Sequence, residues 1–310
     1  MKKMMNSTII SGYIYESRLE KKVSGNESKH PGTEFIAGFL DIATDDACEN
    51  IVSVHYTYST AMTANNKPNA TYGILNNIIN GTYKTIMRDG KENATKITIS
   101  SAIALNEWYD TKGEEPRLVS TMRNEGGFIN VIDNLDPDEA KRNTFRCDIV
   151  INQVRHLEAD EEKNLPEKAI IHGVIFDFRN TILPVDFTVV NPKAIAYFED
   201  QNISNANPFF TQIWGRQIST TVVKENHLTS AFGEDYVQSS TSSRKEWVVT
   251  GAVVDPYEWD TDETITAKEL SEAMSNREVY LATVKKRQEE YQASKSAPAA
   301  SVPNKSAFNF

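Results

Sequence analysis

The chain has 310 residues, of which 39% are hydrophobic and 25% charged, and its formal net charge is −10. This length suits two domains that each bury a core, and the composition is that of a folded globular protein. The acidic balance argues against indiscriminate attraction to polyanions, although it leaves room for a local basic groove.

Targeting and redox signals are absent from the sequence. No stretch approaches the roughly 20 apolar residues that a membrane span needs, and the amino-terminal residues lack the apolar core of a signal peptide. The two cysteines, Cys48 and Cys147, lie far apart and indicate neither a disulfide framework nor a zinc site. We therefore expect a soluble protein of a reducing cytoplasm.

The first part of the chain is rich in β-branched and aromatic residues, which predict strands. Three strands are expected first, over 7–15, 34–42 and 51–58. Apolar residues then recur at spacings of three and four, which predicts a helix over 71–88. Strands return over 95–105, 117–123 and 127–132.

Asp136-Pro137-Asp138 indicates a boundary, after which the same order recurs. A short helix fits 192–200, with Pro192 at its first position. The strands of this second unit are expected over 144–157, 168–178, 182–190, 209–223 and 246–254. Gly38 and Gly173 interrupt the second strand of each unit, where a glycine permits the bulge or bend that a small barrel needs to close.

Five strands with a helix between the third and the fourth are the plan of the OB fold. The sequence thus predicts a mostly β protein with α additions, made of two tandem OB-like five-stranded barrels, a C-terminal helix and a flexible tail. We expect the first OB-like domain over 1–137, the second over 138–258, the C-terminal helix over 259–293 and the tail with its aromatic tip over 294–310.

The C-terminal helix begins at a capping box, Thr266-Ala267-Lys268-Glu269, and is expected to run to about residue 292. Its apolar stripe is interrupted by Arg277 and Gln288, which favours packing on the body over an oligomer seam. A linker rich in serine, alanine and proline follows and ends in Phe308-Asn309-Phe310.

Signatures of catalysis are scarce. The sequence contains no P-loop, no zinc-protease motif and no Cys-x-x-Cys pair. The acidic groups at Asp45-Asp46 and at 158–162 lack the ligand pattern of a calcium loop, so we interpret them as solvated turns. We expect neither an enzyme nor a cofactor or metal; a metal-dependent nuclease that uses scattered carboxylates is the less favoured alternative.

Aromatic and cationic residues alternate along the expected strands, a pattern typical of single-strand binding, in which bases stack on rings beside a positive track. In the first unit the candidates are Tyr13, Tyr15, Tyr56, Tyr58, Trp108 and Arg123. In the second unit they are Arg155, Phe178, Arg179, Trp214, Arg216 and Lys224. Trp214 and Arg216 lie two apart on a strand and so face the same side. The alternative for each ring is a place in a barrel core.

On these features the chain resembles phage-encoded single-stranded-DNA-binding proteins with OB folds. The resemblance rests on the doubled order across roughly 7–254, on Ile213-Trp214-Gly215-Arg216, and on the linker with its aromatic tip. The tip differs from the acidic, proline–phenylalanine tip of bacterial members, because Ser306-Ala307-Phe308-Asn309-Phe310 holds no acid.

The resemblance implies non-catalytic, sequence-independent binding and protection of single-stranded DNA in phage replication or recombination. The implied location is the cytoplasm of the bacterial host, and the implied partners are single-stranded DNA and replication or recombination proteins held by the tail. It implies no membrane partner, and self-association stays open. A virion or assembly protein is the alternative, since such proteins are also β-rich, acidic and without catalytic motifs.

Overall fold

The structure is a computed structural model that describes residues 4–111, 115–160, 166–228, 232, 236–261 and 264–296. The strands of its first half are β1 (Asn6–Val23), β2 (Glu34–Ala43), β3 (Ile51–Thr60), β4 (Lys96–Asp110) and β5 (Arg117–Val131). Those of its second half are β6 (Asn143–Leu157), β7 (Lys168–Phe176), β8 (Ile182–Val189), β9 (Phe209–Leu228) and β10 (Tyr236–Ala252). The helices are α1 (Ala70–Ile79), α2 (Ile86–Asp89), α3 (Pro192–Asp200) and α4 (Ala267–Ser296), with short 3-10 turns at Lys91–Asn93 and Glu139–Lys141.

The strands close into two rings of five, which we call barrel 1 and barrel 2. In barrel 1, β1 pairs with β2, β2 with β3, β3 in parallel with β5, β5 with β4, and β4 with β1. In barrel 2, β6, β7, β8, β10 and β9 repeat this circuit, again with one parallel step between the third and fifth strands. A helix lies between the third and fourth strands of each ring. The predicted fold class, two OB-like barrels in tandem, is confirmed.

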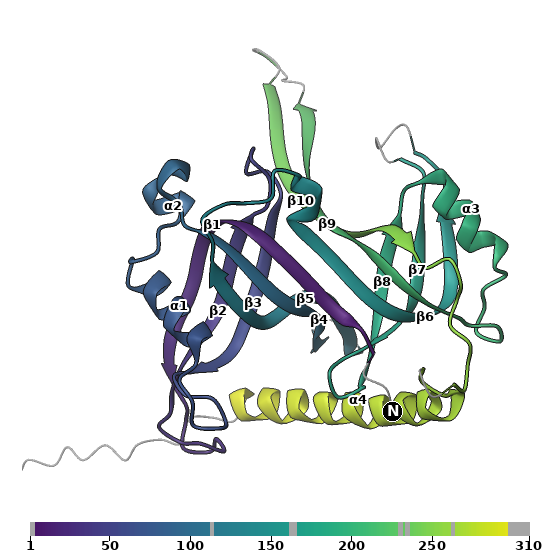
Figure 1. Cartoon of the computed structure of the whole chain (residues 1–310). Coiled ribbons are helices and arrows are strands. Elements are labelled where there is room, and N and C mark those ends of the chain that lie inside the picture. Colours follow the sequence, from purple (N-terminus) through teal and green to yellow (C-terminus); the bar gives the residue numbers. More distant parts are fainter. Residues whose placement is uncertain are drawn as a thin grey trace, which may run out of the picture.

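The two barrels share a seam, at which β1 pairs antiparallel with β6 from Asn6 opposite Cys147 to Ile10 opposite Asn143. This pairing makes one sheet of ten strands out of the two rings. Figure 1 shows the barrels side by side, with α4 running beneath both. The division of the chain between residues 137 and 138 stays a prediction.

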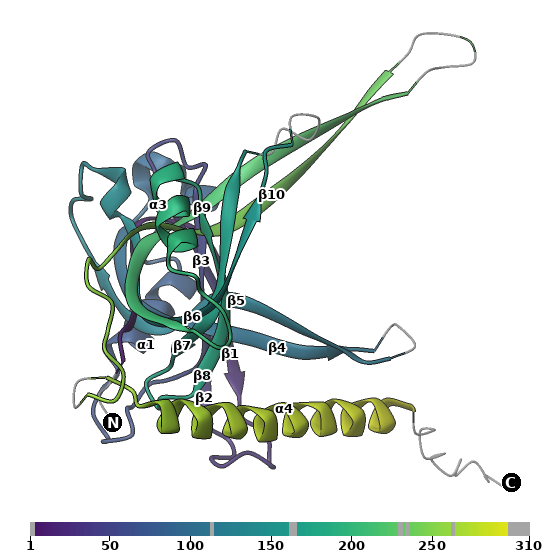
Figure 2. The ribbon, with the colours of Figure 1, turned by 90° about the vertical axis from the view of Figure 1, so that its right-hand side faces the viewer.

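Two long hairpins extend past the barrels. The β4–β5 pairing continues to Asp110 opposite Arg117, and the β9–β10 pairing continues to Leu228 opposite Tyr236. Figure 2 shows that both hairpins project from the same side of the molecule. The sequence did not reveal these extensions, because their polar residues read as loops while strand pairing satisfies their backbone.

Glycines explain two further departures from the expected elements. The helix expected over 71–88 is divided into α1 and α2 because Gly81 takes a φ of +79° just after the end of α1. The strands expected over 117–123 and 127–132 are one strand, β5, with a bulge at Gly126-Gly127, where the pairing shifts between Ser100 and Ala102. Near Gly38 the pairing of β2 with β3 is irregular, and the extra residue lies on the facing strand β3, because Ile36 pairs with Ser59 and Gly38 with Tyr56. Near Gly173 the extra residue likewise lies on the facing strand, β6.

Buried polar side chains hold the barrels against each other beside the seam. Asn124 of β5 and Gln217 of β9 exchange amide hydrogen bonds of 3.0 and 2.9 Å, and Asn143 donates to the Gln217 carbonyl at 2.6 Å. Asn50 of barrel 1 accepts from the Ser219 backbone N–H of barrel 2 at 2.7 Å. Because the amides of Asn124 and Gln217 satisfy each other without charge, we expect a stiff junction between the barrels.

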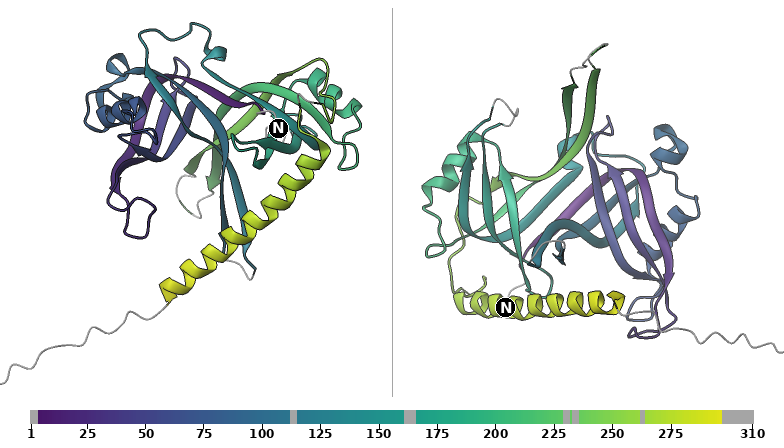
Figure 3. Two further views of the ribbon diagram at one scale, coloured as in Figure 1. Left: turned by 60° about the horizontal axis from the view of Figure 1, so that its bottom comes forward. Right: turned by 180° about the vertical axis from the view of Figure 1, so that it is seen from behind.

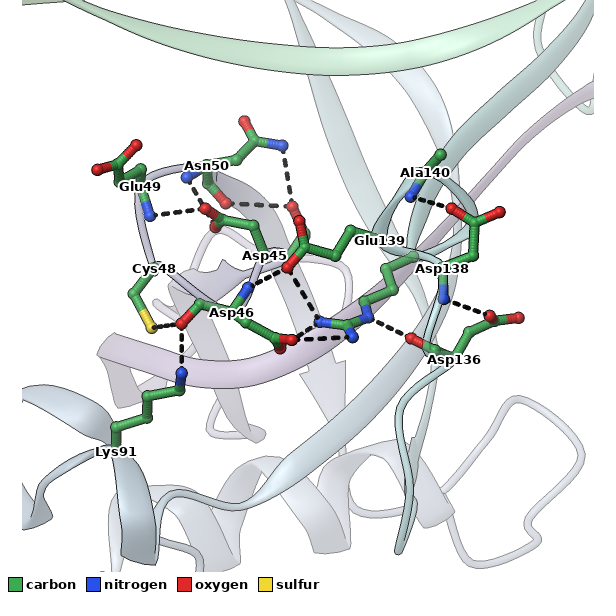
Figure 4. Close-up of polar contacts among 12 residues, drawn as sticks. Asp45, Asp46, Cys48, Glu49, Asn50, Lys91, Asp136, Asp138, Glu139 and Ala140 are labelled. Atoms are coloured by element: carbon green, nitrogen blue, oxygen red, sulfur yellow. Dashed lines mark hydrogen bonds and ion pairs between the residues drawn. The ribbon is translucent and has the colours of Figure 1, made fainter.

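The acidic loop after β2 also belongs to this junction. Asp45 accepts from the backbone N–H groups of Glu49 and Asn50, which makes the turn (Figure 4). Asp46 pairs at 2.6 Å with Arg142, whose side chain is almost fully buried in the connection between the barrels. The Arg142 guanidinium beside Asp46 holds the pKa of that carboxyl below its usual value. The loop therefore links barrel 1 to the connection between the barrels through the Asp46–Arg142 ion pair, and it is not the freely solvated turn that the sequence suggested.

Helix α4 begins at the expected capping box, in which the backbone N–H of Glu269 donates to Thr266 Oγ1 and that of Thr266 donates to Glu269 Oε2. Its first turns pack on barrel 2 through Leu270 and Ala273. The buried guanidinium of Arg277 pairs with Glu107 of β4 and donates to the Ile182 carbonyl of β8. The helix thus packs on the body and fastens both barrels, and Figure 3 shows its far half extending past them. No helix in the described ranges is long and apolar enough to span a bilayer.

Candidate nucleic-acid interface

A groove lies where barrel 1, the β7–β8 turn of barrel 2 and α4 meet. It consists of two cavities of about 880 and 740 Å³. The residues that line both cavities are Glu125, Gly127, Phe128, Phe178 and Arg179. We call the joined space the interbarrel groove.

Three rings stand exposed in this groove. Phe128 is 77% exposed, Phe178 71% and Tyr58 47%. The Arg179 guanidinium lies over the Phe178 ring, 4.9 Å from its centroid. Rings this exposed contribute little to a core, and they offer flat apolar faces beside a cation.

The local sequence turns these rings outward. At the β5 bulge, Gly126 and Gly127 have φ of +61° and +115°, and a Cβ on Gly127 would lie 2.2 Å from the Ser100 carbonyl oxygen. Only glycine fits there, and the bulge directs Phe128 away from the barrel. In the β7–β8 turn, Asp177 Oδ1 accepts from the backbone N–H groups of Arg179 and Thr181, each at 2.8 Å, which fixes the turn that carries Phe178.

The carboxylates of the groove are engaged by the protein itself. Glu125 pairs with Arg123 at 2.7 Å and with His55 at 3.0 Å. Glu107 pairs with Arg277, and Asp177 accepts the backbone bonds of its own turn. Arg179 has no carboxylate partner among the residues that the structure describes. The groove therefore carries less effective negative charge than its residue types suggest.

A second group of rings continues from the groove over the outer face of β2 and β3. The Tyr58 ring centroid lies 4.5 Å from that of Phe35, and the Phe39 ring lies 4.5 Å from the His55 ring. Arg18 lies over Phe39 at 5.4 Å. This face of an OB barrel is the one on which oligonucleotides commonly bind.

The structure brings together three of the predicted site residues, Tyr58, Phe178 and Arg179, in the interbarrel groove. Arg123 lies beside them and is bound to Glu125. Tyr56 is corrected: it is 3% exposed and part of the barrel 1 core, and burial raises the pKa of its hydroxyl. A ring in the core has no face to offer to a base, so we remove Tyr56 from the set.

The other candidates lie away from the groove. Trp108 is 38% exposed on the β4–β5 hairpin, and Arg155 is exposed on β6. Trp214 and Arg216 share the outer face of β9, and Tyr13 and Tyr15 are half-buried on β1. Lys224 belongs to β9, but its side chain lies outside the described residues, as do the tail beyond residue 296 and its aromatic tip.

Sequence reasoning missed Phe128 and Phe39. For Phe128 a signal existed, since a pair of glycines inside a strand pattern indicates a bulge beside it. Phe39 carried none, because in sequence it looks like any ring of a barrel strand.

No cluster of three or more His, Cys, Asp or Glu that could hold a metal ion is present in the described part of the chain.

The model of the YorF family matches residues 5–288. The chain belongs to the YorF family.

No curated protein matches this YorF family member. Among solved structures, it is similar to a deletion mutant of the single-stranded DNA binding protein from Thermus aquaticus. That similarity has a TM-score of 0.45 and 10% sequence identity, and it covers 85% of this chain and 100% of that chain.

Proposed function

We propose that this protein binds single-stranded DNA in the interbarrel groove, without sequence preference and without catalysis. The observation that carries the proposal is the meeting of three exposed rings, Tyr58, Phe128 and Phe178, with Arg179 in one groove between two OB barrels. Stacking of one base on an aromatic side chain contributes about 1–3 kcal/mol, and it tolerates any base because every base has a π face.

The net charge of −10 leaves room for a local site, because the groove carboxylates Glu125 and Glu107 are paired with Arg123 and Arg277. Arg179 then supplies a cation for a phosphate next to a stacked base. Duplex DNA keeps its bases inside the helix, where exposed rings cannot stack on them. We therefore expect a preference for single strands.

The biological part of the proposal follows the resemblance in layout described above. We propose that the protein coats and protects single strands during phage replication or recombination in the host cytoplasm. The tail is proposed to contact replication or recombination proteins. Self-association is left to measurement.

A mobility-shift titration with labelled oligo-dT and with duplex of the same length, at two salt concentrations, tests the proposal. The expected result is binding of oligo-dT alone, with log K falling against log[salt] by about 0.7 for each phosphate neutralised. Phe178→Ala together with Arg179→Ala is expected to weaken binding about 10- to 100-fold.

The matched control is Tyr291→Ala with Lys193→Ala, which removes an exposed ring and an exposed cation from α4 and α3. Unchanged affinity in the groove variant would refute the assignment of the site. Large particles that shift no oligonucleotide would instead support a virion or assembly protein.

A further inference from the structure

A second surface crosses both barrels over their seam. It consists of the outward positions of four neighbouring strands, which follow from the pairing of β4 with β1, β1 with β6, and β6 with β9. These positions are Lys96, Thr98 and Ser100 on β4; Ser7, Ile9, Ser11 and Tyr13 on β1; Thr144 and Arg146 on β6; and Trp214 and Arg216 on β9. We call this surface, with Lys91 beside it, the seam face.

Each end of the seam face holds a ring next to cations. At the barrel 1 end, Lys91 and Lys96 lie over the Tyr13 ring at 5.4 and 5.9 Å. At the barrel 2 end, the guanidinium of Arg146 lies over the Trp214 ring at 5.7 Å. Arg216 follows on the same side of β9, because it is two residues from Trp214.

The position of the Trp214 indole depends on a glycine in the neighbouring strand. The indole lies against Gly251 of β10, where an added Cβ would come within 2.5 Å of the indole nitrogen. The adjacent bulge in β10, between Val249 and Gly251, aligns this glycine with the ring. A tryptophan placed in this way keeps its ring on the outside of the barrel, although it is large enough to fill a core.

The seam face carries cations and hydroxyls but no carboxylate at any of its positions, in a chain of net charge −10. The next outward position on β6 is Asp148, which is 6% exposed. Its carboxylate accepts hydrogen bonds from the Met5 backbone, Gln212 and Tyr257. At the other end, Asp46 is held by Arg142. The surface is therefore locally positive and complementary to a polyanion.

The seam face adjoins the interbarrel groove. Ser7 and Ser100 belong to the seam face and also line the groove. Phe128, the most exposed ring of the groove, is the β5 partner of Ser100. With strands about 4.8 Å apart and residues about 3.3 Å apart along a strand, the seam face extends roughly 22 Å from Tyr13 to Trp214.

We propose that the seam face is a second subsite, which holds the sugar–phosphate backbone of a single DNA strand as that strand leaves the groove. The proposal rests on the proposed function of the groove and extends it to one continuous track over both barrels. The groove binds mainly by stacking, and the seam face binds mainly through Lys91, Lys96, Arg146 and Arg216, with Tyr13 and Trp214 as stacking rings.

Oligo-dT of two lengths separates the two subsites. A strand of about 8 nucleotides fills one site of OB size, whereas a strand of about 30 nucleotides reaches both. For Arg146→Ala with Arg216→Ala, we expect about tenfold weaker binding of the long strand and no change for the short one. The slope of log K against log[salt] for the long strand should become shallower by about 1.4, the value for two phosphates.

The matched control is Lys193→Ala with Lys268→Ala, which removes the same charge from exposed helix positions outside the seam face. The control is expected to leave the affinity for both strands and the salt slope of the long strand unchanged. Equal losses in the two pairs, or an unchanged affinity of the seam variant for the long strand, would overturn the second subsite. If the wild-type protein bound neither the short nor the long strand, the proposed function of the groove would be wrong as well. The failure of the second subsite and the failure of the proposed function are therefore distinguishable.

Tryptophan fluorescence gives a second reading that does not depend on charge. The long strand is expected to quench the indole emission of the wild-type protein more than the short strand does, and Trp214→Phe should abolish that difference. Persistence of the difference in Trp214→Phe would contradict contact at the seam face.

Discussion

The two barrels share one topology but differ in how many aromatic side chains they bury in the core. The core of barrel 1 is built from isoleucine, leucine and valine, with Tyr56 as its only buried ring among the described residues. The core of barrel 2 contains Phe145, Phe187, Phe198 and Trp247. The rings of barrel 1 are instead found outside, in the groove and on the β2–β3 face.

This difference shows that two barrels of the same topology can fill their cores with different kinds of side chain. Aliphatic side chains fill barrel 1, so its rings are free to line a binding surface. Barrel 2 uses rings as core volume, and it contributes to the outer surface mainly cations, Arg146, Arg179 and Arg216, with Phe178 and Trp214. We therefore expect most base stacking on barrel 1 and most phosphate contacts on barrel 2.

The largest expected effect separates a core ring from a surface ring. Phe145 lies 5.0 Å from Phe187 and 5.5 Å from Trp247 between ring centroids, so Phe145→Ala should lower the free energy of unfolding by about 3–5 kcal/mol. Phe128→Ala should change it by no more than about 0.5 kcal/mol while weakening DNA binding. Denaturant unfolding measures the free energy of unfolding of both variants. Similar losses of stability in Phe145→Ala and Phe128→Ala would contradict the distinction between a core ring in barrel 2 and a surface ring in barrel 1.

A smaller loss is expected where α4 joins the barrels. The side chains of Arg277 and Glu107 are 10% and 3% exposed, so Arg277→Ala leaves a buried carboxylate unpaired and should cost about 3 kcal/mol. Arg277→Met combined with Glu107→Leu should recover most of that loss, because it removes both charges. Thermal unfolding checks this, and a double variant as unstable as Arg277→Ala would show that the ion pair is not the fastening element.

A change at Gly251, against which the Trp214 indole packs, is expected to affect DNA binding and not stability. Gly251→Ala displaces the indole without removing it, and should weaken binding of a long oligo-dT about three- to tenfold. Gly25→Ala is the control, because no atom lies within 4 Å of the Cβ it would add. Titration by fluorescence anisotropy is the measurement; equal affinities of the two variants would argue against a role for the indole.

The smallest effect concerns the helix of barrel 2. His156 contacts Glu199 of α3 at 2.7 Å and Glu167 at 2.9 Å, and these carboxylates, Glu199 first, raise its pKa above 6.5. The protonated ring stabilises the fold, so the contribution is present below pH 6.5 and is lost as the pH rises through the raised pKa.

His156→Gln should therefore lower Tm slightly at acidic pH and not at all at alkaline pH, whereas His30→Gln in an exposed loop should leave Tm unchanged throughout. Thermal unfolding between about pH 5 and about pH 9 follows this dependence. A loss of Tm in His156→Gln that stays constant with pH would exclude an ionic contribution of His156 to the attachment of α3.

The order of strands and helices was predictable because each element carries a local signal. Alternating β-branched residues predict strands, and Asn191-Pro192 predicts the start of α3, where the Asn191 side chain accepts from the Lys193 N–H. The site was predictable only in part. Tyr56 and Tyr58 are alike in sequence, yet one lies in the core and the other in the groove, because an irregular pairing of β2 with β3 separates them. Such irregularities depend on strand register, which the local sequence does not contain.

Photo-cross-linking of oligo-dT to the protein, followed by mass spectrometry of the cross-linked peptides, tests most directly whether the outward rings of the interbarrel groove hold DNA. We expect cross-links at Tyr58, Phe128 and Phe178, which unlabelled single strands compete away and duplex does not. Cross-links that avoid all three rings while the protein binds the strand tightly would contradict this expectation.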